Sequence, residues 1–244
     1  MGCATDRVIR SFRNDLYPGY KTEAGAPAEL LAQFALAERA IEALGLVLWP
    51  MVEPEADDAL ATAAARWADD PRIERILICS PDKDLAQCVR DGRVVLRDRR
   101  RGLTIDAAGV VAKWGVPPAA IPDYLALVGD AADGYPGLPG FGAKTAATLL
   151  ARYGSAAAVP ADPGAWDVLV RPAPKLAATL REHAAELALY RTLARLRTDV
   201  PLPQRDPEEL GWRGAPRAAW EAFCDELGLP RLRTWPHRWR PEPA

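Results

Sequence analysis

The stretch that says most about this chain is LVGDAADGYPGLPGFGAKTA, residues 127–146. Asp130 and Asp133 stand three residues apart and run into a glycine-rich loop, after which a helix is expected over 142–153. Carboxylate oxygens suit a divalent cation, and a glycine loop before a helix start lets backbone N–H groups approach a phosphate. The residues of this loop and helix start are Gly137, Gly140, Gly142, Lys144 and Thr145. A metal beside a phosphate indicates phosphodiester chemistry.

Two more groups of acids each follow a short apolar run. Glu55, Asp57 and Asp58 follow an expected buried strand over 46–50, and Asp82 and Asp84 follow a second one over 75–79. Ligands of open α/β sheets bind where the strands end at their carboxyl side, so we expect these groups to converge and the acids of 127–146 to fold over them. For any one group taken alone, capping of a helix start is the better explanation.

Three such groups together favour a metal site. So many carboxylates would repel one another and take up protons unless a cation neutralised them. Oxygen ligands without histidine or cysteine suit Mg²⁺ or Mn²⁺, and two such ions about 4 Å apart can activate water and stabilise a leaving oxygen.

Apolar runs alternate with helices in the first part of the chain. Strands over 46–50, 75–79 and 94–96 alternate with helices over 27–44, 56–68 and 84–90, which indicates a parallel sheet covered on both faces. From about residue 104 only helices are expected. They cover 106–114, 119–128, 142–153, 166–170, 174–197 with a break near His183, and 216–227.

Composition narrows the function classes. The chain has 244 residues, of which 49% are hydrophobic, so a sizeable core is possible. No apolar run reaches the length of a membrane span and no signal peptide is evident, so we expect a cytoplasmic protein with no membrane contact, and we infer no obligate protein partner. The 2 histidines and 4 cysteines show no zinc-ligand spacing. The net charge of −2 is only weak evidence against nucleic-acid binding, since basic residues cluster at 97–101.

Four motifs carry a resemblance to a known family. They are Ser11-Phe12-Arg13 with Tyr17, Tyr20 and Lys21; Glu55-Ala56-Asp57-Asp58; Ser80-Pro81-Asp82-Lys83-Asp84-Leu85; and the Gly129–Thr145 loop. With these motifs the chain resembles the bacterial 5′→3′ exonuclease and flap endonuclease family, of which the 5′-nuclease domain of DNA polymerase I is an example. The resemblance extends from about Thr5 to about Leu229.

The resemblance implies a role for each motif. Asp6, Glu55, Asp57 and Asp58 would serve one metal ion, and Asp82, Asp84, Asp130 and Asp133 the other. Arg13 and Lys21 would contact the scissile phosphate as catalytic groups. The glycine loop with Lys144 and Thr145 would hold the DNA backbone, in this family often with K⁺. Tyr17 and Tyr20 would stack on an unpaired base, although packing within the protein explains them at least as well.

The implied fold is α/β. It has a PIN-like nuclease core with a parallel sheet over 1–115, a helical helix–three-turn–helix subdomain over 116–200, and a segment over 201–244 that packs back on the core. Two departures stand out. The family's first strand and its Asp are missing, so we expect an N-terminally truncated form of a longer parent. Gly134 replaces a common Asn, which we expect to change the rigidity of the loop.

The implied function is a structure-selective, metal-dependent 5′→3′ exonuclease or 5′-flap endonuclease acting on DNA ends, flaps and branched duplex in replication or repair. Two alternatives stay open. A truncated site would leave a protein that binds branched DNA without cutting it. A PIN-type ribonuclease would share the core, although such enzymes usually lack the helix–three-turn–helix element.

Overall fold

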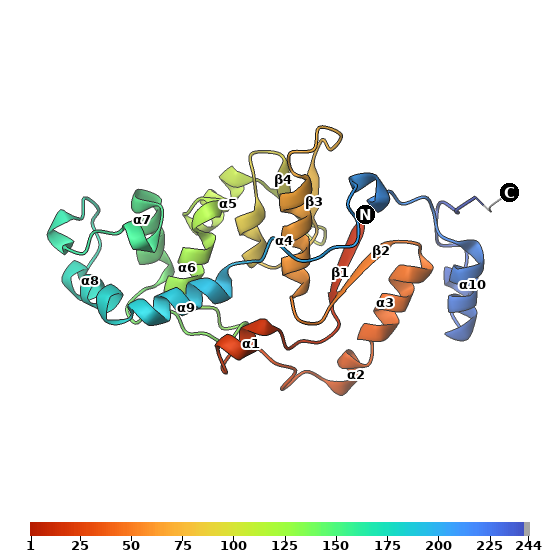
Figure 1. The fold of residues 1–244 in the computed structure, drawn as a ribbon, viewed down its shortest axis with the longest axis horizontal. Coiled ribbons are helices and arrows are strands. Elements are labelled where there is room, and N and C mark those ends of the chain that lie inside the picture. Colours follow the sequence, from red (N-terminus) through yellow and green to blue (C-terminus); the bar gives the residue numbers. More distant parts are fainter. Residues whose placement is uncertain (242–244) are drawn as a thin grey trace. The chain divides into compact units, whose positions relative to one another are not determined.

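The computed structural model describes residues 1–241, so the last three residues of the expected 201–244 segment lie outside the described residues. The chain divides into two compact units, and Figure 1 labels their helices and strands. The first unit comprises Met1–Ser11, Thr22–Ala59 and the segment that begins at Asp199. The second unit comprises Phe12–Lys21 and Leu60–Thr198.

The first unit is a small parallel sheet with helices packed beside it. Its elements are β1 (Gly2–Asp6), α2 (Ala28–Leu31), α3 (Phe34–Ala43), β2 (Val47–Met51), the start of α4 (Ala56–Trp67), and, near the C-terminus, η5 (Pro207–Leu210), α10 (Arg217–Glu226) and η6 (Pro230–Leu232). Strands β1 and β2 pair in parallel, with Gly2 opposite Val47 and Asp6 opposite Met51. A parallel pair needs a long crossover, and the α2–α3 segment supplies it.

Aromatic side chains build the core of the first unit. Trp220 and Phe223 of α10 stack with ring centroids 5.8 Å apart and pack with Ala43 of α3. Gly45, with φ of +71°, ends the helix that precedes β2, a conformation that glycine adopts without steric cost. The ring of Trp49 in β2 fills the space beside Gly2, where a Cβ would lie 2.4 Å from it. Apolar burial of this kind contributes about 25 cal/mol per Å².

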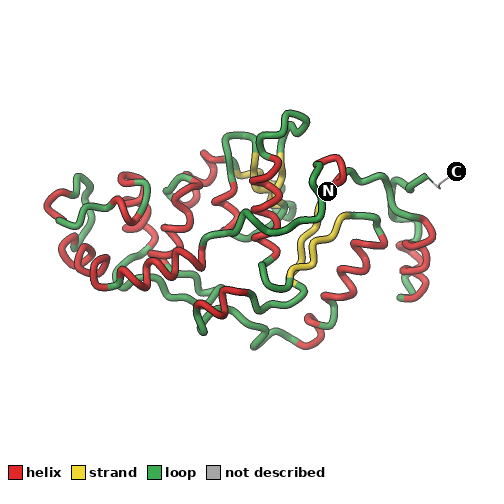
Figure 2. Tube along the Cα trace, in the orientation of Figure 1, coloured by secondary structure: helices red, strands yellow, loops and turns green. Residues whose placement is uncertain are grey.

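The second unit combines a three-stranded sheet with a helical region. Its elements are α1 (Phe12–Leu16), the remainder of α4, β3 (Ile76–Ile78), η1 (Asp84–Cys88), β4 (Val94–Asp98), β5 (Leu103–Ile105), α5 (Ala107–Trp114), η2 (Pro118–Ala120), α6 (Ile121–Val128), α7 (Ala143–Tyr153), η3 (Ala156–Ala158), η4 (Pro163–Ala165), α8 (Ala173–Glu182) and α9 (Ala184–Ala194). Beyond β5 the described chain forms helices and loops without a further strand (Figure 2).

Helix α6 is the centre of the second unit. Seven of its eight residues are buried, as expected for a helix that is apolar all round. It packs against α7 and α9, and its buried Asp123 accepts a hydrogen bond from Arg191 Nε of α9 at 3.0 Å. Helix α6 ends at Val128 and is followed by Gly129, so Asp130 and Asp133 lie at the edge of this core.

The parallel α/β architecture with a following helical region is confirmed, with differences in detail. The described strands form two sheets, β1–β2 and β3–β4–β5, one in each unit, and β5 pairs antiparallel with β4. The sequence did not reveal β5 because three residues, Leu103–Ile105, are too few to establish an alternating pattern.

Several helix expectations needed correction. The expected helix 27–44 is interrupted between α2 and α3, and 84–90 is the 3₁₀ helix η1. The helix expected over 166–170 is wrong: this segment is irregular and contains two β-branched valines shortly before Pro172, which disfavours helical backbone. The break near His183 is confirmed, between α8 and α9. Within residues 1–241, no helix is both long and apolar enough to cross a bilayer.

Candidate metal centre

The loop after α6 holds Asp130 and Asp133 in a tight turn. The Asp130 carbonyl accepts hydrogen bonds from the backbone N–H groups of Gly134 and Tyr135 at 2.8 and 3.1 Å, and the Asp130 N–H donates to the Tyr135 carbonyl at 2.8 Å. Asp130 Oδ1 accepts from the Ala132 N–H at 3.0 Å. These bonds satisfy the backbone locally and leave Asp130 Oδ2 outside this network.

Glycines let backbone segments meet around this turn. A Cβ on Gly129 would lie 2.4 Å from the Pro136 carbonyl, and one on Gly137 would lie 2.3 Å from the Gly129 nitrogen. Gly134 has φ of +89°, and a Cβ there would lie 2.2 Å from the Gly19 carbonyl oxygen. The glycine at 134 is therefore required for close approach of the segment around Lys21, beyond the change of rigidity that the sequence predicted.

The second pair of acids follows β3. The Asp82 N–H donates to Ser80 Oγ at 3.2 Å, and the Asp84 N–H donates to Asp82 Oδ1 at 2.9 Å. Asp84 opens η1 and is only 6% exposed. One carboxylate oxygen of Asp82 therefore accepts a backbone hydrogen bond at the start of η1, while the side chain of Asp84 is buried.

Three carboxylates meet within the second unit. One oxygen each of Asp84, Asp130 and Asp133 lies within 4.8 Å of the others, and all three residues are buried. Asp84 Oδ1 and the hydroxyl of Tyr135 are buried without a hydrogen-bond partner, while Asp130 Oδ2 has the Lys83 ammonium as its partner. Burial, followed by the negative charges of Asp82, Asp133 and Asp130, raises the pKa of Asp84 well above its usual range. We call Asp84, Asp130 and Asp133 the acidic cluster.

Two lysines face the acidic cluster. Lys83 Nζ forms an ion pair with Asp130 Oδ2 and lies 4.0 Å from Asp84 Oδ1. Lys21 Nζ lies 3.0 Å from Asp133 Oδ1, and the Lys21 N–H donates to the Asp133 carbonyl at 3.0 Å. Burial would lower the pKa of Lys83, but the hydrogen bond to Asp130 and the charges of the neighbouring acids raise it overall.

The acidic cluster fits a divalent cation. Its donors are all oxygens, and Asp84 Oδ1 and the Tyr135 hydroxyl are buried beside it without a hydrogen-bond partner. Burial and then the neighbouring negative charges raise the pKa of Asp84, and a cation would neutralise those charges. The sequence singled out all three acids. The quoted motifs contain Lys83 and Tyr135, but the sequence predicts no role for either, because residues adjacent in the chain do not show which side chains they contact.

The other four predicted metal ligands lie in the first unit, one at the end of β1 and three around the start of α4. Asp6 Oδ1, at the end of β1, accepts from the Ala56 N–H at 2.6 Å, and Asp58 Oδ2 accepts from the Glu55 N–H at 2.9 Å. Glu55 Oε1 accepts from Ser11 Oγ at 3.2 Å. Asp58 and Glu55 are buried and Asp57 is half-buried. The structure thus brings Asp6, Glu55 and Asp58 together, with Asp6 and Asp58 bonded to backbone N–H groups at the helix start.

The structure gives Arg13 partners other than a phosphate. Its side chain is fully buried, and Nε and one Nη donate to the carbonyls of Leu193 and Arg195 at 2.8 and 3.0 Å. These carbonyls lie at the C-terminal end of α9, where a helix leaves acceptors unsatisfied. The expected contact of Arg13 with the scissile phosphate would require the guanidinium to leave them.

The two tyrosines near Lys21 take part in packing. Tyr20 is 3% exposed and belongs to the core of the second unit. Tyr17 meets Tyr190 edge-on at 5.9 Å, and Tyr190 stacks on Tyr135 at 5.5 Å. Both rings thus make packing contacts within the protein, and their stacking on a base stays a prediction.

The glycine loop is buried at Gly137 and opens to solvent from Gly140 to the start of α7. Gly140, Gly142 and Lys144 are exposed and Thr145 is half-exposed, whereas Leu138 and Phe141 anchor the loop in the core. The space where a Cβ would stand on Gly142 is empty. The N-terminal end of an eleven-residue helix is therefore accessible to an anion.

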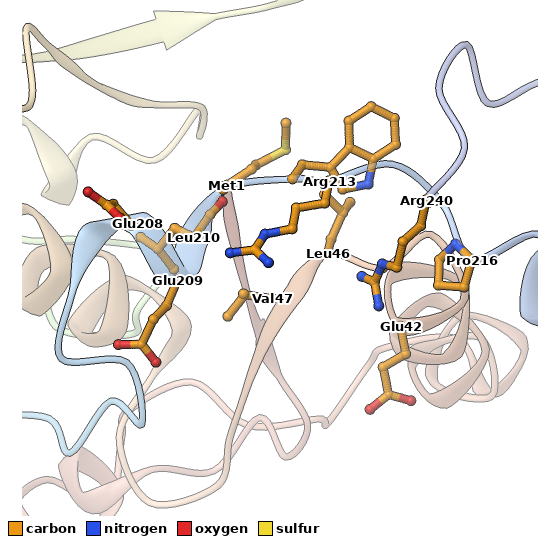
Figure 3. Close-up of a pocket in the computed structure, with 13 residues that line it drawn as sticks. Met1, Glu42, Leu46, Val47, Glu208, Glu209, Leu210, Arg213, Pro216 and Arg240 are labelled. Atoms are coloured by element: carbon orange, nitrogen blue, oxygen red, sulfur yellow. The ribbon is translucent and has the colours of Figure 1, made fainter. Parts of the chain in front are cut away.

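A separate cavity of about 680 Å³ lies in the first unit (Figure 3). Side chains of both charge signs line it, among them Glu42, Glu209, Arg213 and Arg240. None of the predicted site residues contributes to it, so we assign it no part in the chemistry.

Comparison with known proteins agrees with this geometry. Residues 1–115 match the family described as 5′-3′ exonuclease, N-terminal resolvase-like domain, and residues 116–218 match 5′-3′ exonuclease, C-terminal SAM fold. DNA polymerase I of Rhizobium leguminosarum is 38% identical over 226 residues, which cover 85% of this chain and 21% of that protein. The thermostable DNA polymerase I of Thermus aquaticus is 37% identical over 235 residues, 92% of this chain and 27% of that protein.

Solved structures share the fold. The T5 D15 protein co-crystallised with metal ions superposes with a TM-score of 0.62 at 17% identity, covering 94% of this chain and 84% of that one. The catalytic core of Rad2 in complex with DNA substrate superposes with a TM-score of 0.57 at 14% identity, covering 96% and 75%. The chain spans about a fifth to a quarter of the length of the curated relatives named above. With both of its parts matched, this chain belongs to the 5′-3′ exonuclease family.

Proposed function

We propose that this protein is a metal-dependent 5′→3′ exonuclease and 5′-flap endonuclease that acts on DNA. The observation that carries the proposal is the buried acidic cluster, in which Asp84 Oδ1 lacks a hydrogen-bond partner, in a chain of the 5′-3′ exonuclease family. Related folds support it: a T5 D15 structure is described as a flap endonuclease in a complex with DNA and metal ions, and Rad2 as bound to DNA substrate.

Mg²⁺ or Mn²⁺ is the proposed cofactor, with two ions per active site. Asp82, Asp84, Asp130 and Asp133 would hold one ion, and Asp6, Glu55, Asp57 and Asp58 the other. When bound, such ions supply Lewis-acid chemistry: they lower the pKa of water and neutralise charge on a phosphodiester. Hard dications prefer carboxylate oxygens, which is the only ligand type that these residues offer.

The chain's own groups would then orient the substrate. Lys21, held beside Asp133, is the proposed contact to the scissile phosphate, where its charge opposes the charge that develops in the transition state. Arg13 is proposed to act first as the cap of α9, because its guanidinium donates to two carbonyls of that helix end.

DNA would be gripped through its backbone. Gly137, Gly140 and Gly142 with Lys144 and Thr145 are proposed to hold a phosphate, with K⁺ as a further ligand of this loop. Contacts of this kind read no bases, so cleavage should depend on DNA structure and be insensitive to sequence. We place the nuclease core in residues 1–115, the DNA-gripping subdomain in 116–200 and a returning segment in 201–244. Such a substrate implies a place beside the nucleoid in the cytoplasm.

The test is cleavage of a 5′-flap DNA with Mg²⁺ or Mn²⁺. Asp57→Asn and Asp82→Asn should each lower the rate by about 100-fold or more, since even outer-shell partners of metal ligands cost 10–100-fold. Asp91→Asn, which changes an exposed acid outside both groups, is the matched control and should cleave normally.

Other results would favour the alternatives. Flap binding with no turnover under any divalent ion would indicate a DNA-binding protein, and cleavage of RNA in preference to DNA would indicate a PIN-type ribonuclease. Equal rates for Asp82→Asn and Asp91→Asn would remove the acidic cluster from the mechanism.

A further inference from the structure

Lys83 has a position that the proposed nuclease chemistry does not explain. It stands between Asp82 and Asp84 in the chain, yet its ammonium reaches across to Asp130 in the loop after α6. The same ammonium lies 4.0 Å from Asp84 Oδ1. Its side chain is 37% exposed, while those of Asp130 and Asp84 are 3% and 8% exposed.

The acidic cluster needs positive charge whatever it binds. Three carboxylates with oxygens within 4.8 Å of one another repel strongly in a buried environment. The charged groups that face the cluster are Asp82, Lys83 and Lys21, and the positive members touch different carboxylates, Lys83 the Asp130 side chain and Lys21 the Asp133 side chain.

The two lysines are held differently. Lys21 is anchored to Asp133 through its backbone N–H as well as its ammonium. Lys83 meets Asp130 and Asp84 through its side-chain ammonium, which stands on a flexible and partly exposed stem. Lys83 is therefore the cation that can leave Asp130 without any movement of the backbone.

We propose that the Lys83 ammonium is a tethered counter-ion that competes with a divalent cation for Asp130 and moves aside when the ion binds. This inference rests on the proposed function in one respect, that the acidic cluster binds a divalent ion. It makes Lys83 a positioning residue that keeps the three carboxylates together between metal-binding events.

The competition has a measurable consequence. A group that stabilises only the metal-free state lowers the apparent affinity for metal, so its removal should raise that affinity. A lysine that merely supported the shape of the site would have the opposite effect, because its removal would weaken metal binding.

The experiment compares Lys83→Met, Lys83→Gln and Lys83→Arg with Lys175→Met, which removes the same charge from an exposed position of α8. Mn²⁺ binding is measured by calorimetry, and the melting temperature is measured in chelator and in excess Mn²⁺. Lys83→Met and Lys83→Gln should bind Mn²⁺ on the order of fivefold more tightly, a modest factor because the ammonium is partly screened by solvent. Both should melt lower in chelator and gain more from Mn²⁺ than the wild type.

The controls and outcomes separate this inference from the proposed function. Lys83→Arg and Lys175→Met should resemble the wild type in both measurements. Unchanged or weaker Mn²⁺ binding in both neutral Lys83 variants would overturn the counter-ion proposal, even if the enzyme cuts DNA. If the Lys83 variants show the expected changes in Mn²⁺ binding but the protein does not cleave DNA, the counter-ion proposal stands and the proposed nuclease activity is refuted. If the wild type binds no Mn²⁺, displacement is refuted, and the melting temperatures in chelator still decide whether Lys83 neutralises the cluster.

Discussion

Gly134 is a single residue on which the geometry of the acidic cluster depends. Its φ of +89° is unfavourable for other residues, and a Cβ would meet the Gly19 carbonyl oxygen at 2.2 Å. Backbone cannot yield as a flexible side chain can. The contact therefore joins the loop that carries Asp133 to the segment that carries Lys21.

We predict that Gly134→Ala destabilises the protein by more than the conformational penalty alone, by about 2 kcal/mol or more. Gly92→Ala is the matched control, since Gly92 also has a positive φ of +73° but nothing within 4 Å of the added Cβ. It should cost about 1 kcal/mol. Denaturant unfolding of both variants measures the difference, and equal losses would show that the close approach to Gly19 is not needed.

Asp84 predicts a pH dependence of stability in the absence of metal. Burial and then the neighbouring acids raise its pKa in the folded protein, so the folded state binds this proton more tightly than the unfolded chain does. The resulting stabilisation is complete below the unfolded-state pKa, about 4, and is lost as pH rises through the higher folded-state pKa.

In chelator, the melting temperature of the wild type should therefore fall relative to that of Asp84→Asn as pH rises above about 4. Excess Mn²⁺ should remove the fall, because a divalent ion stabilises the ionised carboxylate. Parallel melting profiles of the two proteins in chelator would contradict the shift.

At the scale of elements, α9 shows how one side chain terminates a helix from a distance. The Arg13 guanidinium binds the carbonyls of Leu193 and Arg195, which the helix itself leaves without partners. Because Arg13 is fully buried, its charge depends on groups inside the protein, and these two carbonyls are among them. Tyr190, on the same helix, stacks on Tyr135 beside the acidic cluster.

Arg13→Met should destabilise the protein by about 3 kcal/mol, since it leaves buried carbonyls without donors. Arg13→Lys should not restore stability, because an ammonium lacks the planar fork that reaches both acceptors. Arg10→Met, at an exposed arginine, is the control for loss of charge. Urea unfolding measures each. Normal stability of Arg13→Met with lost cleavage would instead place Arg13 at the phosphate.

At the scale of the whole molecule, charge balance governs binding of a polyanion. The chain has 33 acidic and 31 basic residues, a net charge of −2. The residues proposed as metal ligands are acidic, so divalent ions bound to them would shift the balance toward the positive side where DNA is expected to bind.

We predict that Ca²⁺, a hard oxygen-binding dication, tightens binding of 5′-flap DNA by at least about tenfold over chelator at matched ionic strength. Fluorescence anisotropy measures the affinity. The gain should shrink in Asp82→Asn and persist in Asp91→Asn. Equal affinity with and without Ca²⁺ would indicate that DNA is held without help from the carboxylates.

Much of the fold and of the candidate site could be predicted from local patterns. Apolar runs located β2, β3 and β4, glycines and prolines marked the ends of helices, and close pairs of acids identified Asp84, Asp130 and Asp133 as partners. The break between α8 and α9 was also visible. These features depend on residues a few positions apart, which is the range over which propensity and periodicity act.

The amino-acid sequence by itself determined which residue types are available for metal and phosphate and in which elements they lie. Only the tertiary structure decided that Lys83 meets Asp130, that Arg13 caps α9, and that Tyr20 is buried. The reason is physical. A charged or aromatic side chain takes its role from the group that it contacts, and these contacts join segments that are distant in the chain and are brought together only when the core closes around α6.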